Sequence, residues 1–322
     1  SDWSSDVCSS DLNNLELKAP VSVSVTSELA GSIGSVAASG SGAGTAALNG
    51  SVTTNAINAT VLAEATLVNQ TVSSPGDFVV HADNSANIAS LAGTVSGGGT
   101  AGAGVAISVN EIGGSVIARA SDTTLRSLGD VDLQANTSGT IRSLAAGIAG
   151  GGTAGVAGSN TTNAITSTVL AQLNAVRMAE DAVTVTVRAR DTSTIESFAG
   201  SVAVGGTGGG GAAIALNFLG RTATEADSSK QVKAEVLNSN LKSGGAVLVQ
   251  ALSSSSIDSM AIAVGVGGSA AVTGANTTNW LEDEITATWS GGSLYGSGNS
   301  LTVQAQDGAS VETLASNVSA SG

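Results

Sequence analysis

The sequence predicts an all-β protein, a β-solenoid (parallel β-helix) built from repeats of about 54–62 residues. Three observations support this: a recurring strand motif, a glycine-rich run at one point of each repeat, and a composition poor in aromatic residues. The strand motif is apolar–any–apolar followed by a polar residue and alanine. Its six copies start at Leu15, Phe78, Val131, Val185, Val247 and Leu301, at intervals of 63, 53, 54, 62 and 54 residues. Such self-similarity indicates units that bury their apolar faces against their neighbours.

A second strand begins about six residues after each motif. Its copies are 88–92, 141–145, 195–199, 257–261 and 311–315, with a degenerate copy at 26–30. A glycine-rich run, a strand of small residues and an asparagine–threonine segment follow in the same order. The repeats are therefore 26–87, 88–140, 141–194, 195–256 and 257–310, with a partial unit at 311–322.

Alternation of apolar and polar residues, as in 183–187, is the local strand signal. The best helical window, 171–181, lies where other copies are typical of strand or loop. The chain has 43 glycines, 2 prolines and 2% aromatic residues, too little bulk for an ordinary β-sandwich core. Stacked coils suit small residues, because each side chain lies above its own copy at the roughly 4.8 Å strand spacing. Asparagine can also form a side-chain ladder along such a stack.

The number of coils in a repeat stays open between one wide coil and two or three ordinary ones. At about twenty residues per coil the stack would be roughly 70 Å long. The length differences between repeats precede the next strand motif, as at 71–77, where insertions typically project as loops.

The first twelve residues resemble the translation of a sequencing adapter, so 1–12 is interpreted as non-native and excluded from the fold. Cys8, the only cysteine, lies in that segment, and no disulfide framework is expected. Residues 13–322 are then one continuous array and, we expect, a fragment of a longer protein.

The net charge of −14 argues against nucleic acid or anionic membrane as a partner. The uncharged run 143–176 is long enough to span a membrane, but its glycine, threonine and asparagine favour a solenoid stretch.

Four groups of residues could form chemical sites, but a structural interpretation is favoured for each. Gly-x-Gly-x-x-Gly starts at Gly97, Gly150 and Gly206, at the same point of successive repeats, whereas a dinucleotide-binding fold would carry it once, before a helix.

His81 takes an outward polar position of the strand motif, with no partner in view. Glu282, Asp283 and Glu284 form the densest acidic cluster, which could bind an ion but favours a solvated loop. The pairs Asp181/Asp191 and Glu225/Asp227 could serve a hydrolase only if each pair meets in space.

Trp280, Trp289 and Tyr295 cluster in one repeat and are the only ligand-contact candidates. They could stack on a sugar ring or a partner chain. Trp280 takes the position of Ala56 and Ala164 in other copies, which favours packing. No catalytic residue, cofactor site or metal site is predicted.

Residues 13–322 resemble the repeat region of large bacterial surface adhesins, of the leukotoxin-type filamentous, filamentous-haemagglutinin-like and autotransporter-passenger classes. The segments that carry the resemblance are 201–206, 211–217 and 247–251. It implies a secreted or outer-membrane-associated stalk, without enzymatic activity, that mediates attachment or biofilm formation. The implied partners are glycans or proteins of a host surface or matrix, or neighbouring cells, and any membrane anchor would lie outside this segment.

A carbohydrate-binding or carbohydrate-active solenoid, such as a lyase or hydrolase, is the alternative. It would place acidic and basic residues in a stack on one face of several coils, whereas the charged residues look scattered along the sequence. A threonine array that binds an ordered surface would need Thr-x-Thr in every coil, and Thr184-x-Thr186 is not repeated at 247–249.

Overall fold

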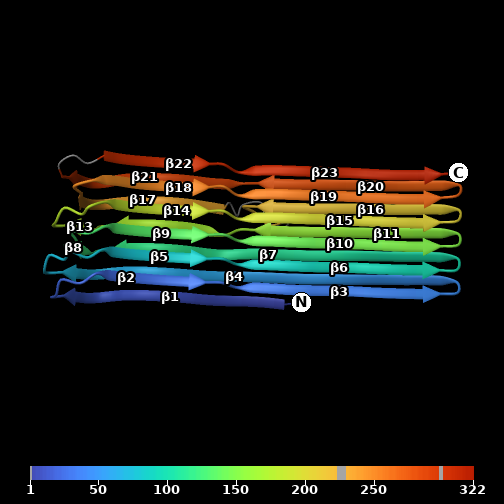
Figure 1. The fold of residues 1–322 in the computed structure, drawn as a ribbon, viewed down its shortest axis with the longest axis horizontal. Coiled ribbons are helices and arrows are strands. Elements are labelled where there is room, and N and C mark those ends of the chain that lie inside the picture. Colours follow the sequence, from blue (N-terminus) through green and yellow to red (C-terminus); the bar gives the residue numbers. More distant parts are fainter. Residues whose placement is uncertain (1, 223–229, 297–299) are drawn as a thin grey trace.

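A computed structural model describes residues 2–222, 230–296 and 300–322, and it confirms the β-solenoid. All the regular elements in these ranges are strands, and every pairing between them is parallel. The strands form three sheets whose neighbours come from successive repeats. The two shorter sheets lie end to end in one layer, and the third forms the opposite layer (Figure 1).

We name the sheets by their place in the coil. The proximal sheet contains β2 (Val23–Leu29), β5 (Phe78–Asn84), β9 (Val131–Thr137), β14 (Val185–Asp191), β18 (Ala246–Ser253) and β22 (Ser300–Asp307). The distal sheet contains β3 (Ser32–Ala43), β6 (Asn87–Gly98), β10 (Thr140–Gly151), β15 (Thr194–Gly205), β19 (Ser256–Gly267) and β23 (Ser310–Ser321). The long sheet contains β1 (Asp2–Leu17), β4 (Ala46–Gln70), β7 (Ala101–Ser121), β8 (Thr124–Leu125), β11 (Ala154–Ile165), β12 (Thr168–Asn174), β13 (Arg177–Met178), β16 (Gly208–Leu219), β17 (Lys230–Lys242), β20 (Ala270–Leu281) and β21 (Asp283–Tyr295).

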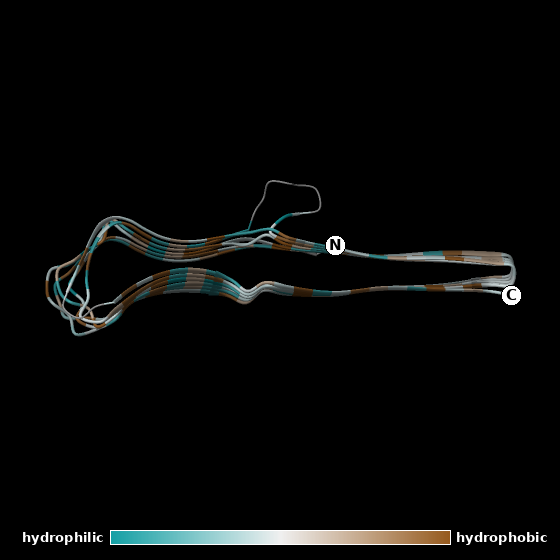
Figure 2. Ribbon diagram, turned by 90° about the horizontal axis from the view of Figure 1, so that it is seen from above, coloured by the Kyte–Doolittle hydropathy of each residue, from teal (hydrophilic) through white to brown (hydrophobic). Residues whose placement is uncertain are grey.

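Each repeat makes one wide coil. Val185 pairs with Val131 on one side and Val247 on the other, so equivalent residues of successive repeats are direct neighbours. The chain runs out along the proximal and distal sheets, turns, and returns along the long sheet (Figure 2). Six strands stacked at about 4.8 Å occupy roughly 29 Å, so the expected stack length of about 70 Å is wrong. The length of each repeat sets the width of one coil and does not add further coils to the stack.

The strand register also corrects the first copy of each landmark. Phe78 pairs with Val23, so the first strand motif is 23–27, and Leu15 instead pairs with Val68 of the long sheet. Ile88 pairs with Ile33, so the second strand begins with 33–37 and not 26–30, and the first full repeat begins at Ile33. Segment 71–77 connects β4 to β5 but holds no insertion, because the corrected interval from Val23 to Phe78 is close to that of other repeats.

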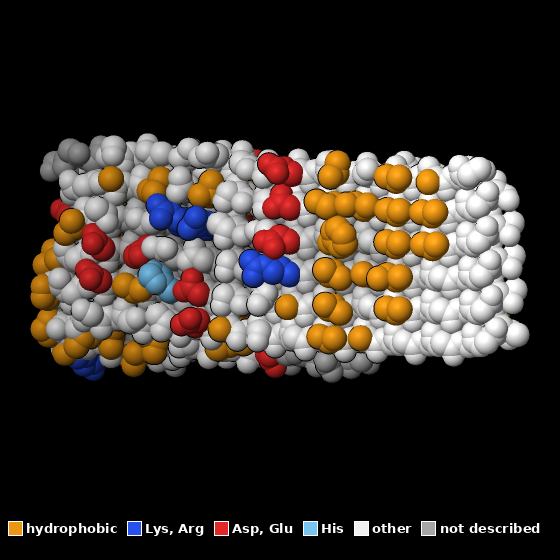
Figure 3. Space-filling model, turned by 45° about the vertical axis from the view of Figure 1, so that its right-hand side comes forward, with side chains coloured by type: hydrophobic (Ala, Val, Ile, Leu, Met, Phe, Trp, Pro, Cys, Tyr) orange, Lys and Arg blue, Asp and Glu red, His pale blue; other side chains and the backbone are white. Residues whose placement is uncertain are grey.

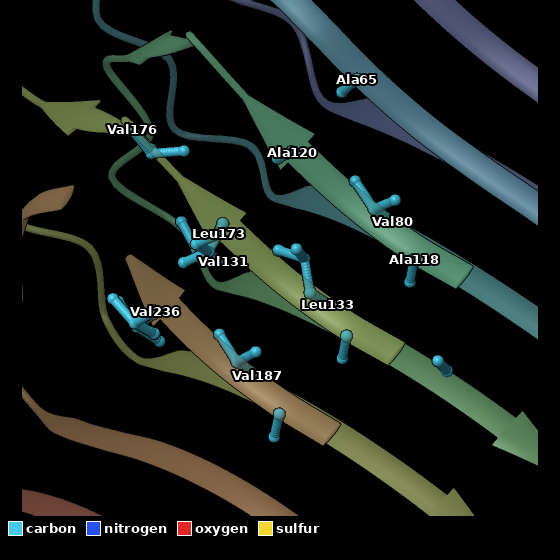
Figure 4. Close-up of a cluster of buried hydrophobic side chains, with 14 of the residues drawn as sticks. Ala65, Val80, Ala118, Ala120, Val131, Leu133, Leu173, Val176, Val187 and Val236 are labelled. Atoms are coloured by element: carbon cyan, nitrogen blue, oxygen red, sulfur yellow. The ribbon is translucent and has the colours of Figure 1, made fainter. Parts of the chain in front are cut away.

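The lobe beneath the proximal sheet has an ordinary apolar core. Valine, leucine and alanine from β5, β9 and β14 face those of β7, β12 and β17, and all are buried. Figure 4 shows Val80, Leu133 and Val187 directed toward Ala118, Leu173 and Val236 from the opposite layer. A second row of stacked isoleucines, including Ile88, Ile141, Ile112 and Ile165, closes this lobe where the proximal and distal sheets meet.

The lobe beneath the distal sheet is thinner, because its inward side chains are small and polar (Figure 2). Ala92, Ala145 and Ala106 pack there, beside buried Ser90 and Ser108, whose hydroxyl oxygens lie 2.7 Å apart. An asparagine ladder runs through this lobe, as the sequence allows: Asn55, Asn110, Asn163 and Asn217 each donate a side-chain hydrogen bond to the next asparagine, ending at Asn279, at 2.7–2.8 Å.

The glycine motifs form the turn at the tip of the distal lobe, which confirms their structural interpretation. Gly151 ends β10 and the chain reverses into β11 at Ala154. A Cβ atom on Gly151 would collide with the carbonyl oxygen of Ala154, and one on Gly152 with that of Gly99 in the preceding coil. Glycine is therefore required by the close approach of stacked turns.

Candidate functional site

The three aromatic candidates do not form one platform. Trp280 lies on the outside of β20, 42% exposed, with its ring stacked 6.4 Å from Phe218 of the preceding coil. The guanidinium of Arg221 lies 4.4 Å from the Trp280 ring centroid, within cation–π range. Trp289 instead packs inward against the proximal core, and Tyr295 is exposed at the far end of β21. The register places Trp280 in line with Phe218 and Ala164, as expected from the sequence.

The acidic cluster lies at the start of β21, where strand alternation directs the side chains of Asp283 and Glu284 to opposite faces of the sheet. Glu284 points outward, where its carboxylate lies 3.2 Å from the ammonium of Lys233 and accepts a 2.9 Å hydrogen bond from Gln231. Asp283 points inward and is buried. The prediction of a solvated loop is wrong for Asp283, because strand alternation turns it into the lumen between β17 and β18.

A buried ionic cluster forms around Asp283. The ammonium of Lys230, fully buried, forms ion pairs with Asp191 and, at 3.1 Å, with Asp283. It also donates a 2.7 Å hydrogen bond to Ser255, so all three of its protons have acceptors. Asp191 is held by the backbone NH of Ser193 at 2.8 Å. Burial raises the pKa of Asp283 despite the opposing charge of Lys230.

The cluster joins three coils: β14, the β17–β18 coil and β21. It is sealed from solvent, so a substrate cannot reach it. Lys230 carries no local sequence signal, and nothing in the repeat pattern predicts that it points inward. We interpret the cluster as a structural connection between coils.

The carboxylate pairs do not meet as dyads. Asp181 is exposed before β14 begins, whereas Asp191 is buried at the end of that strand. Six extended residues of β14, 185–190, lie between them and span roughly 20 Å. Glu225 and Asp227 lie outside the described residues. In the ranges that the structure describes, no three His, Cys, Asp or Glu residues gather in a metal-binding group.

His81 has the partner that the sequence did not reveal. Its Nε2 lies 3.0 Å from Asp132 on the next coil, and both side chains are partly buried. This hydrogen bond raises the pKa of His81, against a smaller opposing effect of burial. A polar groove of about 490 Å³ lies on the outside of the proximal sheet and is lined by residues that include Asp83, Arg188 and Arg190, but not by His81 or Asp132.

A second groove, of about 880 Å³, crosses the outside of the distal sheet. One wall is a charged row in which Arg142, Glu196, Asp258 and Glu312 occupy the same position of successive coils. Arg142 Nε donates a 2.9 Å hydrogen bond to Glu196. The charged residues are therefore not scattered: these four lie at the repeat intervals, which is the signal that would have identified the row in the sequence.

Beside the charged row lies a field of outward apolar side chains. The first row is Val36, Leu91, Leu144, Phe198, Met260 and Leu314. A parallel row lies four residues further along each strand and consists of Val95, Ile148, Val202, Val264 and Val318. Figure 3 shows the apolar field beside the column of charges. Many of these side chains are exposed, so the face is suited to adhesion to another apolar surface.

No helix in the described ranges is long and apolar enough to cross a bilayer. No protein-family profile matches the chain, and neither a curated protein nor a solved structure is significantly similar to it.

Proposed function

We propose that the chain is a structural stalk segment of a secreted or surface-anchored bacterial adhesin that mediates attachment or biofilm formation. The in-register stack supports this proposal: the same residue types superpose coil after coil, in the motif row Val131, Val185 and Val247 for example. A stack of this kind lengthens by repetition and needs no site chemistry to serve as a spacer. The sequence resemblance to filamentous adhesins supports the cellular role.

Immunogold labelling of the encoding bacterium with antibodies to the purified chain tests this proposal. We expect label on the outside of the cell, and we expect deletion of the gene to reduce attachment to surfaces. Label confined to the cell interior would contradict the proposal. So would unchanged attachment in the deletion strain.

A carbohydrate-binding or carbohydrate-active role is the second candidate. The charged row of Arg142, Glu196, Asp258 and Glu312 favours it, because a sugar chain lying across the coils would meet one charged side chain in each of four successive coils. The polar groove on the proximal sheet, lined by Asp83, Arg188 and Arg190 among others, offers further charged and hydrogen-bonding groups. A glycan array and a polysaccharide-depolymerisation assay on the purified chain separate the two candidates. Binding lost in Glu196→Gln but kept in Glu284→Gln would favour the sugar role.

A further inference from the structure

The distal lobe has its polarity reversed. Its interior holds serine, threonine, asparagine and alanine, whereas its outer face carries valine, leucine, isoleucine, methionine and phenylalanine. Ile148, for example, is 46% exposed, while its neighbour Ala149 is buried. Soluble monomers rarely leave a contiguous apolar field of this kind uncovered. We therefore expect another molecular surface of complementary shape to cover the outer face of the distal sheet.

We propose that the outer face of the distal sheet binds the same face of a second copy of this chain, about a two-fold axis parallel to the strands. Such an axis keeps each row over the same row and reverses the order of the six coils. The third coil of one copy then faces the fourth coil of the other, the second faces the fifth, and the first faces the sixth. This inference goes beyond the stalk function and does not depend on it.

The face has the size that a stable dimer needs. Six strands at about 4.8 Å, and five outward rows at about 6.6 Å, cover roughly 29 by 33 Å. That is about 950 Å² from each copy, within the range of a specific protein–protein interface of standard size. Two aligned sheets pack face to face in the same manner inside β-sandwiches.

The side-chain sizes complement one another under this axis. The first three coils carry glycine at several outward positions, and the later coils carry bulky residues there. Gly93 faces Ile262, Gly97 faces Val266, and Gly150 faces Val204 of the second copy. The reversal also places Leu144 against Phe198. At the three glycine positions small residues therefore receive large ones, whereas in the row of Leu144 bulky apolar side chains meet one another.

The charges are complementary as well. In the charged row, Arg142 of one copy faces Glu196 of the other. Asp258 faces Ala89, and Glu312 faces Gly34, so no carboxylate meets another. A cationic peptide or a lipid surface would cover the apolar rows equally well, but neither would require the match between glycine and bulky residues. The second copy is the occupant that the register favours.

Sedimentation equilibrium on the purified chain tests the proposal. We expect a concentration-dependent dimer, and we expect Val202→Lys to weaken it by roughly 100-fold or more, because the ammonium would be buried against Ile148. Val156→Lys, on the outside of β11 in the same lobe, is the matched control and should leave the dimer unchanged. Both side chains point outward, so circular dichroism and the melting temperature should stay close to those of the unsubstituted chain.

Mixing two variants tests the axis itself. Ile148→Glu alone should also be monomeric, whereas a mixture of Ile148→Glu with Val202→Lys should recover a dimer, because the new charges face each other. A monomeric mixture would overturn the coil-reversed geometry. The proposal would be overturned if the unsubstituted chain stayed monomeric at high concentration. This holds also if the monomer bound phosphatidylcholine vesicles or a lysine-rich amphipathic peptide, because the apolar face would then have a different occupant.

Discussion

Lys230 is the residue whose environment departs furthest from ordinary solvent. It is fully buried between Asp191 and Asp283, and among the described residues its ammonium is the one positive charge that forms an ion pair with these two carboxylates. Removing one member of a buried ionic cluster leaves the other charges without compensation in a poorly polarisable interior. The cost is far larger than the net contribution of an intact pair.

We expect Lys230→Met to lower the free energy of unfolding by about 3–5 kcal/mol. Lys233→Met, which removes the partner of exposed Glu284 only three residues away, should cost less than about 1 kcal/mol. Urea denaturation at neutral pH measures both. Equal effects of the two substitutions would show that Lys230 is not buried as described.

His81 makes the stability depend on pH. Its pKa in the folded chain lies above the ordinary histidine value of about 6.5, chiefly through the hydrogen bond to Asp132. The protonated form therefore stabilises the fold: the contribution is complete below the unfolded pKa and disappears as the pH rises through the folded pKa. Because both side chains are partly exposed, the contribution is less than about 1 kcal/mol.

His81→Gln is the natural substitution, since glutamine occupies this row at Gln134 in the next coil. We expect the stability difference between the unsubstituted chain and His81→Gln to shrink as the pH rises from 5 through neutrality, by thermal melting at fixed ionic strength. A difference that grows with pH would contradict the assigned direction of the shift.

At the scale of the element, the asparagine ladder links the long-sheet strands of five coils. Asn163 accepts a hydrogen bond from Asn110 and donates one to Asn217, both at 2.8 Å, and it is fully buried. We expect Asn163→Ala to cost about 2–3 kcal/mol, because it leaves polar groups unpaired on both sides. Asn160→Ala, outward on the same strand, should cost under about 0.5 kcal/mol. Chemical denaturation that shows no difference between the two variants would argue against the ladder.

The tip turn gives an equally sharp contrast between neighbouring residues. A Cβ atom on Gly151 meets backbone atoms of Ala154 and Ala101, whereas one on Gly150 meets nothing within 4 Å. In a Val202→Lys background, which keeps the chain monomeric, we therefore expect Gly151→Ala to destabilise the fold by several kcal/mol, and Gly150→Ala to be neutral or slightly stabilising. Melting temperatures of the two variants compare them directly, and an equally tolerant Gly151 would exclude the stacked turn.

The sequence predicted some elements well because their signal is periodic. Strand identity, the structural role of Gly-x-Gly-x-x-Gly and the asparagine ladder all follow from residues that recur at the repeat interval. The first copies of the landmarks were misplaced because Leu15 and Thr26 imitate the pattern locally, and only the pairing of Val23 with Phe78 decides between them. The inward position of Lys230 and the partner of His81 depend on contacts between coils, which no local window contains.

At the scale of the whole molecule, the sequence did not decide how many coils a repeat forms, and the reason is physical. Alternation marks a strand but does not say which alternate side chains point inward. In the distal lobe the small and polar residues are inside, so the usual assumption that bulky apolar residues mark the core fails there. The same reversal leaves the outer face apolar and gives the molecule its surface for association.

The distance between spin labels on His81→Cys and Gln304→Cys, in a Cys8→Ser background, tests the one-coil repeat most directly. The two positions are outward in the same row, four coils apart through Gln134, Arg188 and Gln250. One coil per repeat predicts a backbone separation of about 19 Å, plus the label arms, by pulsed dipolar spectroscopy. Three coils per repeat would separate the labels by roughly 58 Å, and a distance near that value would contradict the account.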